Sequence, residues 1–181
     1  DFTPQPSTCG RCHDEVTFHR TAYGDWDGDG SVEGIQAEVS ALLDILRDAL
    51  MGWRFDEVDQ IYDHSWSDKA TPEQVTAAAN AGRSMINYLG HGSKYKWVTS
   101  SFGASHAEAL QNGTAWPMIW DVACVNGDFV GGSDCFGEAW AKAGTPDAPQ
   151  GAIGMVAAST NMSWHPPVDW QRFAVVDGMI G

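Results

Sequence analysis

Two short apolar runs, each ending in a chemically reactive residue, constrain the fold of this chain most. SMINYLGHG covers residues 84–92 and PMIWDVACVNG covers residues 117–127. Each run is too short to cross a membrane and is closed by small or polar residues, which is typical of a buried strand. Because parallel strands end at one edge of a sheet, the sequence predicts that His91 and Cys124 meet at that edge.

Helical patterns alternate with the apolar runs and indicate an α/β fold. TPEQ at residues 71–74 is a capping box with proline at the first helical position, so a helix is expected to precede the first run. Further helices are predicted near residues 106–110 and 135–142, and further strands over residues 58–63 and 151–160. This alternation predicts a mostly parallel sheet flanked by helices.

The pairing of His91 with Cys124 points to nucleophilic catalysis. A thiol is the best nucleophile among neutral side chains, and a nearby imidazole raises its thiolate fraction or takes its proton. The imidazole can then protonate a leaving amine, while the backbone N–H groups of Gly92 and Cys124 stabilise an acyl oxyanion. The alternative is an inert buried cysteine beside a loop histidine. The glycines that flank both residues favour the catalytic interpretation.

Several motifs resemble the gingipain family of cysteine peptidases in order and spacing. They lie between residues 53 and 170 and read YLGHGS, WDVACVNGDF, CFGEAW, GAIGMVAAST and NMSW. The resemblance implies a caspase-like fold and an endopeptidase that cuts proteins after basic residues. The expected partner is therefore a protein or peptide substrate. A secreted or periplasmic location is expected on the same ground.

The resemblance also implies roles for individual residues. His91 matches the catalytic histidine of the family, and Cys124 matches its nucleophile. Gly92 matches the glycine of the oxyanion hole. Val122 and Trp164 match residues that line the pocket for the substrate side chain.

Upstream of Trp53 the chain departs from the family pattern. The family has there one acid that orients the histidine and another that receives the basic substrate side chain. Glu33, Glu38 and the aspartates of residues 25–29 are candidates for these roles by position only. The strand expected at the centre of the caspase-like sheet has no clear counterpart either, which predicts an incomplete sheet.

The first fifty residues contain a haem-attachment motif. Cys9, Cys12 and His13 have the C-x-x-C-H spacing, in which two thioether bonds hold haem and the histidine binds its iron. Residues 8–50 also resemble a segment of multihaem c-type cytochromes. Covalent haem c is therefore a candidate cofactor, and a metal-binding or redox CxxC is the alternative.

Asp25, Asp27 and Asp29 alternate as in the first positions of an EF-hand loop. Alternating carboxylates converge on a hard cation, so calcium is a candidate ligand. Position twelve of the loop is Gln36 rather than a bidentate glutamate, which predicts weaker binding. A solvated acidic turn is the alternative, because DGDG favours a turn on its own.

Charge and length limit the partners and the organisation of the chain. The formal net charge of −14 argues against nucleic acid and anionic membrane surfaces as partners. No stretch reaches the roughly twenty apolar residues of a membrane span. By motif, residues 1–50 form a cytochrome-c-like segment with the CxxCH and the acidic turn, and residues 51–181 form a truncated gingipain-like peptidase domain.

The main hypothesis is a cysteine endopeptidase that uses a Cys/His dyad and cuts after basic residues. One rival is a c-type haem electron-transfer protein that carries an inactive peptidase-like scaffold. A second rival is a binding module whose groove holds a peptide without turnover. The predicted fold class is the same for all three: α/β and caspase-like, with a short N-terminal haem-motif segment.

Overall fold

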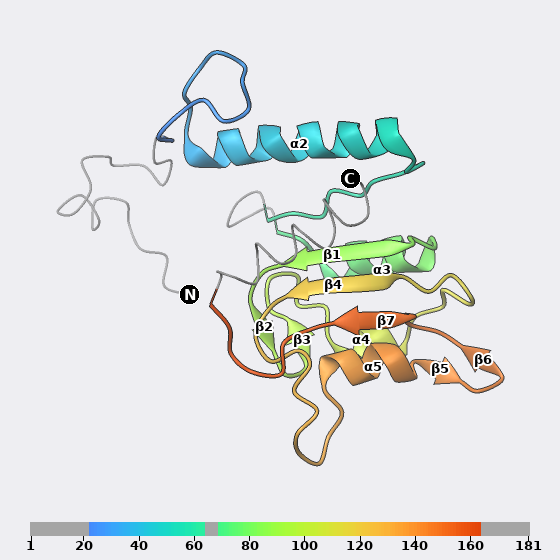
Figure 1. Ribbon diagram of the computed structural model, residues 1–181. Coiled ribbons are helices and arrows are strands. Elements are labelled where there is room, and N and C mark those ends of the chain that lie inside the picture. Colours follow the sequence, from blue (N-terminus) through green and yellow to red (C-terminus); the bar gives the residue numbers. More distant parts are fainter. Residues whose placement is uncertain (1–21, 64–68, 164–181) are drawn as a thin grey trace. The chain divides into compact units, whose positions relative to one another are not determined.

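The computed structural model describes residues 22–63 and 69–163 (Figure 1). The chain divides into two compact units, Asp1–Val58 and Asp59–Gly181. Within the described residues, no helix is both long enough and apolar enough to span a bilayer. The haem-motif residues Cys9, Cys12 and His13, and the proposed pocket residue Trp164, lie outside the described residues.

The first unit consists of an acidic loop and the long helix α2, Ile35–Trp53. Glu38 lies in the first turn of α2, where the positive end of the helix dipole stabilises a negative charge. Its side chain is buried and accepts hydrogen bonds from the backbone N–H groups of Trp26 at 2.9 Å and Glu33 at 3.0 Å. The loop is therefore tied to the start of the helix.

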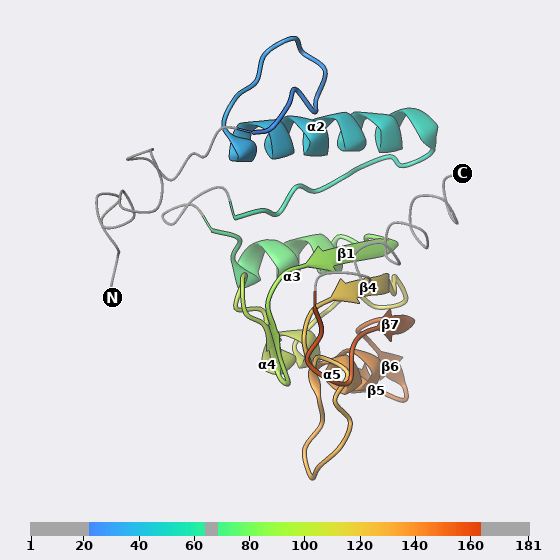
Figure 2. The same cartoon turned by 60° about the vertical axis from the view of Figure 1, so that its left-hand side comes forward.

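A three-stranded parallel sheet forms the centre of the second unit. Its order is β1 (Met85–Leu89), β4 (Met118–Val122) and β7 (Gly154–Val156). Figure 1 shows the three arrowheads pointing to the same edge, and Figure 2 shows the same stacking order from another side. In this register Leu89 lies opposite Val122, so β1 and β4 end side by side.

Three short helices contribute to one hydrophobic core with the sheet. They are α3 (Pro72–Asn80), α4 (Ala104–Glu108) and α5 (Phe136–Lys142). The predicted capping box begins α3: Thr71 Oγ1 accepts from the N–H of Gln74, and Gln74 Oε1 accepts from the N–H of Thr71. The core joins all three helices to β4, and its buried members are Val75, Ala79, Trp97, Phe102, Ala107, Leu110, Ile119, Phe136, Ala139 and Trp140.

A short hairpin after β1, with two residues in each strand, packs against this core through an aromatic cluster. The hairpin pairs β2 (Gly92–Ser93) with β3 (Lys96–Trp97) in antiparallel fashion. The ring centroid of Trp97 lies 4.5 Å from that of Tyr88 and 5.1 Å from that of Phe136. A second hairpin, β5 (Gly144–Thr145) with β6 (Ala148–Pro149), follows α5.

The predicted strand over residues 58–63 is wrong, because the segment forms no strand. Two of its six residues are aspartates, which fit poorly into a pleated ladder. Both carboxylates are used elsewhere: Asp59 pairs with Arg83 at 2.6 Å, and Asp63 accepts from the backbone N–H of Ala70 at 2.8 Å. The segment instead contributes the half-buried Ile61 to the edge of the core.

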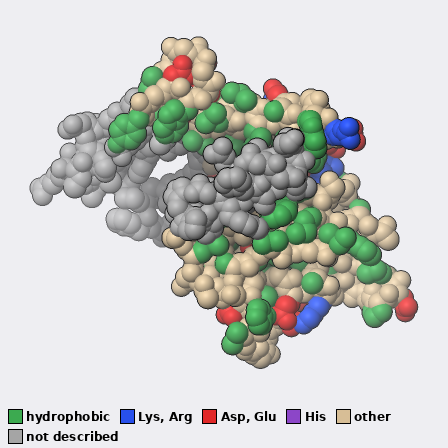
Figure 3. Space-filling model, viewed as in Figure 1, with side chains coloured by type: hydrophobic (Ala, Val, Ile, Leu, Met, Phe, Trp, Pro, Cys, Tyr) green, Lys and Arg blue, Asp and Glu red, His purple; other side chains and the backbone are tan. Residues whose placement is uncertain are grey.

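Acidic residues outnumber basic ones by 24 to 10 in the chain. The face shown in Figure 3 carries few Lys and Arg side chains, and hydrophobic side chains gather there over the strands of the sheet. This surface offers few basic groups to a polyanion. The absence of a nucleic-acid partner stays a prediction from the charge balance.

Candidate functional site

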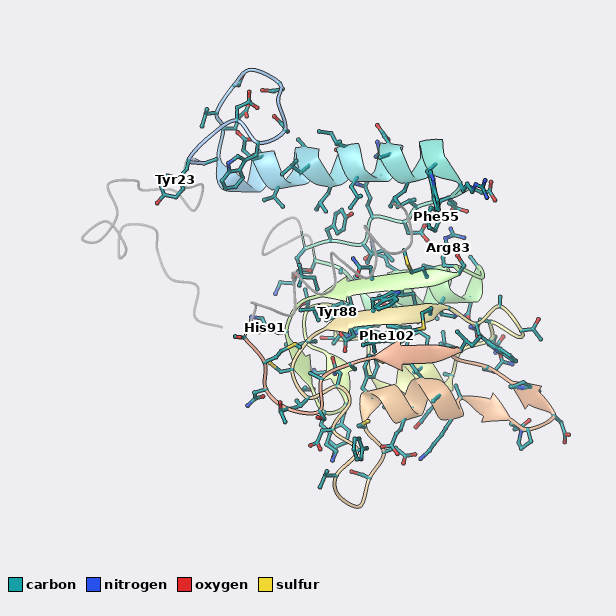
Figure 4. All side chains as sticks on the ribbon, viewed as in Figure 1. Tyr23, Phe55, Arg83, Tyr88, His91 and Phe102 are labelled. Carbon is teal, nitrogen blue, oxygen red and sulfur yellow. The ribbon has the colours of Figure 1, made fainter. Side chains whose placement is uncertain are left out.

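The loops after β1 and β4 form a pocket at the edge where both strands end. The N–H of Gly90 donates to the carbonyl of Val122 at 3.2 Å, which ties the loop after β1 to the end of β4. Figure 4 shows His91 just beyond the arrowhead of β1. The pocket has a volume of about 110 Å³ and is lined by Gly90, His91, Val122, Ala123, Cys124, Met162 and Ser163. Three residues predicted from sequence, His91, Val122 and Cys124, are therefore brought to one cavity.

Cys124 lies at the start of a strained turn. Its side chain is half-buried, and Sγ lies 3.7 Å from the carbonyl oxygen of Met162. The next residue, Val125, has φ of 52°, a left-handed conformation that is unfavourable for a β-branched side chain. The N–H of Val125 donates to Thr160 at 3.1 Å, which helps to hold the turn. Strain of this kind clusters at functional sites.

The backbone of His91 is fixed by two donors to its carbonyl oxygen. The N–H of Val98 donates at 2.8 Å and the hydroxyl of Tyr88 donates at 2.9 Å, with Thr99 Oγ1 lying 3.0 Å from the same hydroxyl. Burial raises the pKa of Tyr88 above its ordinary value of 10.0, so the hydroxyl keeps its proton at neutral pH. The histidine is thereby presented at the mouth of the pocket from a fixed main chain.

Gly92 packs directly against the segment that carries the cysteine. A Cβ added to Gly92 would lie 2.7 Å from Asn126 Oδ1 and 2.8 Å from Ala123 Cβ, and it would overlap the carbonyl oxygen of Cys124. Only glycine allows the two main chains to approach so closely. This approach suits the oxyanion-hole role predicted for Gly92 and Cys124.

Asp121, three positions before the cysteine, is a buried carboxyl that sequence reasoning missed. It is 4% exposed, and its Oδ1 accepts from Nε1 of the buried Trp97 at 3.0 Å. Its Oδ2 has no hydrogen-bond partner within the described part of the chain. Burial raises the pKa of Asp121 to about 7, although the bond from Trp97 opposes the rise. The sequence feature that could have identified this residue is an aspartate within an otherwise apolar predicted strand.

Glu38, one of the upstream acids considered by position, is used inside the first unit. The N–H groups of Glu33, Trp26 and Asp27 all donate to Glu38, and these bonds lower the pKa of Glu38. Within the described lining of the pocket there is no carboxylate. Within the first unit, the carboxylate of Glu38 is therefore held by the loop that precedes α2. An orienting role for Glu33 or Glu38 stays a prediction by position only.

Asp25, Asp27 and Asp29 come together as the EF-hand comparison predicts. Each offers one carboxylate oxygen, and these oxygens lie within 4.8 Å of one another. The same carboxylates stabilise the turn, since Asp25 accepts from the N–H groups of Gly28 at 2.6 Å and Gly30 at 2.9 Å. The loop geometry thus fits both a cation loop and a solvated acidic turn.

A larger pocket lies away from this chemistry. It has a volume of about 400 Å³ and is lined by Asp59, Gln60, Ile61, Gln74, Ala77, Ala78, Ala81 and Arg83. Arg83 and His91 lie at opposite ends of β1 (Figure 4). The described residues that line the larger pocket include no cysteine, serine or histidine. Its two charged residues, Asp59 and Arg83, pair with each other. The smaller pocket is therefore the candidate site.

Comparison with known proteins places these features in a family. The model of peptidase family C25 matches residues 7–175. Gingipain R2 and gingipain R1 of Porphyromonas gingivalis are each 35% identical over 151 residues, which is 83% of this chain. The same stretch is 19% of the first protein and 14% of the second, so the chain spans less than a fifth of these relatives.

Two solved structures are similar to the chain in fold. The complex of the pro- and mature domains of Porphyromonas gingivalis RgpB has a TM-score of 0.65 at 37% identity, over 77% of this chain and 31% of that one. The Arg specific cysteine proteinase gingipain R has a TM-score of 0.65 at 35% identity, over 77% and 30%. These likenesses confirm the expected caspase-like α/β class. The family match covers residues 8–50 as well, and the likeness of that segment to cytochromes gains no support.

Proposed function

The chain belongs to peptidase family C25, and on that basis we propose that it is a cysteine endopeptidase acting through Cys124 and His91. The observation that carries the proposal is that both residues line one pocket at the C-terminal edge of a parallel sheet. A nucleophile and a base from neighbouring strand ends are what acyl transfer requires.

In the proposed reaction, the thiol proton of Cys124 passes to His91 and the sulfur attacks the scissile carbonyl carbon. The electron pair of the carbonyl moves to its oxygen, where the N–H groups of Gly92 and Cys124 stabilise the charge. His91 returns the proton to the leaving amine as the C–N bond breaks. A water molecule then gives a proton to His91 and attacks the thioester carbonyl carbon. The C–S bond breaks, the acid product leaves, and the sulfur of Cys124 takes the proton back from His91.

The proposed substrates are proteins or peptides cut after a basic residue. The support is the similarity to a proteinase described as Arg specific, together with a net charge of −14 that attracts cationic chains. Val122 and Met162 give the described part of the pocket an apolar wall along which the methylene groups of Arg or Lys can pack. Trp164 is proposed as a further wall, and the membership of the family supports a secreted or periplasmic location.

Covalent labelling tests the dyad without requiring a good substrate. A peptidyl acyloxymethyl ketone ending in Arg is expected to modify Cys124 and to spare the buried Cys135, as read by peptide mapping. The His91→Ala variant should label much more slowly, because the thiolate loses its partner. Labelling that is spread equally over all four cysteines, or that is unaffected by His91→Ala, would contradict the proposal.

Calcium binding by Asp25, Asp27 and Asp29 is a separate proposal. Its support is that the three carboxylates converge within 4.8 Å. Neutralising one carboxylate should remove most of the affinity, since charge drives this coordination. We expect calcium to raise the melting temperature of the parent and to leave Asp27→Asn unchanged. An equal shift in both proteins would argue for the solvated turn.

The haem alternative rests on the Cys9-x-x-Cys12-His13 motif. Expression with a cytochrome maturation system tests it directly. A Soret band that survives acid–acetone extraction would support covalent haem, and its absence would remove the electron-transfer function. The peptidase proposal does not depend on this outcome.

A further inference from the structure

Asn126, two residues after the proposed nucleophile, is fully buried and bonds to the hairpin that carries Gly92. We propose that Asn126 is a positioning residue that holds Gly92 against Cys124 and so sets the geometry of the oxyanion hole. The inference rests on the proposed function. It assigns to Asn126 no contact with substrate.

The hairpin β2–β3 needs outside support to hold its place. It contains only two residue pairs, Gly92 with Trp97 and Ser93 with Lys96. A two-stranded hairpin is marginal in water even when it is longer. The position of Gly92 therefore depends on the contacts that the hairpin makes with the rest of the unit.

The side-chain amide of Asn126 supplies such a contact to both strands at once. Its Nδ2 donates to the carbonyl oxygen of Ser93 at 2.5 Å and to that of Lys96 at 3.1 Å. These two carbonyls belong to the residue pair next to Gly92 in the ladder. Because the amide is buried, water cannot replace the bonds if they are lost.

In the β2–β3 ladder, the N–H of Gly92 is not directed at the opposite strand. The N–H of Val98 donates to the carbonyl of His91 at 2.8 Å, so Gly92 and Trp97 between them form a non-hydrogen-bonded pair. The N–H of Gly92 is thus not directed at Trp97. At the same time the α-carbon of Gly92 faces Asn126 Oδ1, which lies 2.7 Å from where a Cβ would be.

Asn126 is itself fixed from two sides. Its carbonyl accepts from the N–H of Gly137 in the first turn of α5 at 3.0 Å. The N–H of the following Gly127 donates to Ala158 at 2.9 Å. The backbone around Asn126 is thus bonded to α5 and to the segment after β7, and the side-chain amide of Asn126 links the hairpin to both. Asp121 provides a second tie on the other side of Cys124, through its bond to Trp97.

The experiment compares Asn126→Asp with the parent in three assays. The variant keeps the shape of the side chain but loses both donors, so two carbonyls face an oxygen. We expect kcat for peptide hydrolysis to fall about 10- to 100-fold with KM nearly unchanged, because transition-state stabilisation is lost. Affinity for a peptide aldehyde, whose adduct carries the oxyanion, should fall in parallel. Alkylation of Cys124 by iodoacetamide, which needs no oxyanion hole, should stay within about two-fold.

Asn112 offers a matched control, because it is not among the residues that line the His91 pocket. It is also buried, and its Nδ2 donates to two carbonyls, those of Ala115 at 2.9 Å and Gly151 at 2.7 Å. Asn112→Asp should lower the melting temperature while leaving kcat and aldehyde affinity of the folded protein within about two-fold. Asn126→Ser, which retains one short donor, provides a milder variant with the same expected pattern if Asn126→Asp does not fold.

Each outcome has a distinct meaning. A parent that neither hydrolyses peptides nor binds the aldehyde overturns the proposed function and the role of Asn126 with it. An active parent whose Asn126 variants match it in kcat overturns the positioning role alone. Equal losses in hydrolysis and in alkylation would also overturn it, because they would place the effect on the thiol or on the whole fold.

Discussion

The buried carboxyl of Asp121 lies three positions before Cys124 in the chain. In the folded state its pKa is raised to about 7 from the ordinary value of 3.8. The folded state therefore binds a proton that the unfolded state releases between these two values. Stability from this group is complete below pH 3.8 and is lost as the pH rises toward about 7.

We predict that Asp121→Asn removes this part of the pH dependence. The amide oxygen can still accept from Trp97, but the side chain no longer titrates. The unfolding free energy of the variant relative to the parent should rise with pH, by at most about 1.4 kcal/mol per pH unit between about pH 4 and pH 7. Urea titrations of both proteins across this range measure the difference. A difference that stays constant with pH would show that Asp121 titrates normally.

Substitution of Gly92 tests the close approach of the two segments that form the candidate site. In Gly92→Ala the new methyl group would meet Cys124, Asn126 and Ala123, and overpacking of this kind costs about 1–3 kcal/mol. We expect a lower melting temperature and a loss of kcat, because the hairpin must shift. Gly132→Ala is the control, since a Cβ at Gly132 has nothing within 4 Å. Equal activity of Gly92→Ala and the parent would remove the close-approach argument.

Some residues of the candidate site could be predicted and others could not. His91, Cys124 and Val122 lie at or just past the ends of apolar runs, and the parallel arrangement of the runs brings them together. Asn126 was missed because its partners Ser93 and Lys96 lie about thirty residues away in sequence. Only folding shows that its amide reaches both carbonyls.

At the scale of single elements, local signals predicted helices better than strands. The capping box correctly predicted the start of α3. The bounds of α4 and α5 lie within two residues of the predicted ones. The strand predicted over residues 151–160 is limited to Gly154–Val156. Strands depend on a ladder partner, which the residues of one segment do not specify.

The capping box of α3 allows a test at this scale. Thr71→Ala removes the side-chain acceptor for the N–H of Gln74 and should destabilise the second unit by about 1 kcal/mol. Thr76→Ala, in the same helix, removes only a bond from Thr76 Oγ1 to the carbonyl of Pro72 and should change stability by less than about 0.5 kcal/mol. Thermal unfolding of both variants measures the contrast. A larger loss in Thr76→Ala would contradict the assignment of the cap.

At the scale of the whole molecule, net charge is the property that acts over the longest distance, through its electric field. The chain carries 24 acidic and 10 basic residues, so its field attracts cationic peptides. We predict that kcat/KM for a peptide rich in Arg and Lys falls several-fold as salt rises above about 0.1 M, where screening acts within about 10 Å. Hydrolysis of an uncharged peptide by the same protein should change little. Equal salt dependence of both would show that the field does not guide the substrate.

The organisation of the whole chain was the least predictable level. The sequence resemblances divide the chain near residue 50, and the family match extends across that point from residue 7 to residue 175. The CxxCH motif is a short local pattern, whereas the family likeness depends on many positions in order. The strand-end motifs thus predicted that His91 and Cys124 line one pocket, whereas the CxxCH motif assigned the N-terminal segment to a likeness that gains no support.

The most direct test of the account is hydrolysis of fluorogenic peptides that end in Arg, Lys or Asn, under reducing conditions with calcium, by the parent and by Cys124→Ala. We predict cleavage by the parent, strongest after a basic residue, and none by Cys124→Ala when its circular dichroism spectrum matches that of the parent. Equal cleavage by both proteins would contradict the dyad. A folded parent that binds these peptides without cleaving them would identify a binding module and contradict the peptidase.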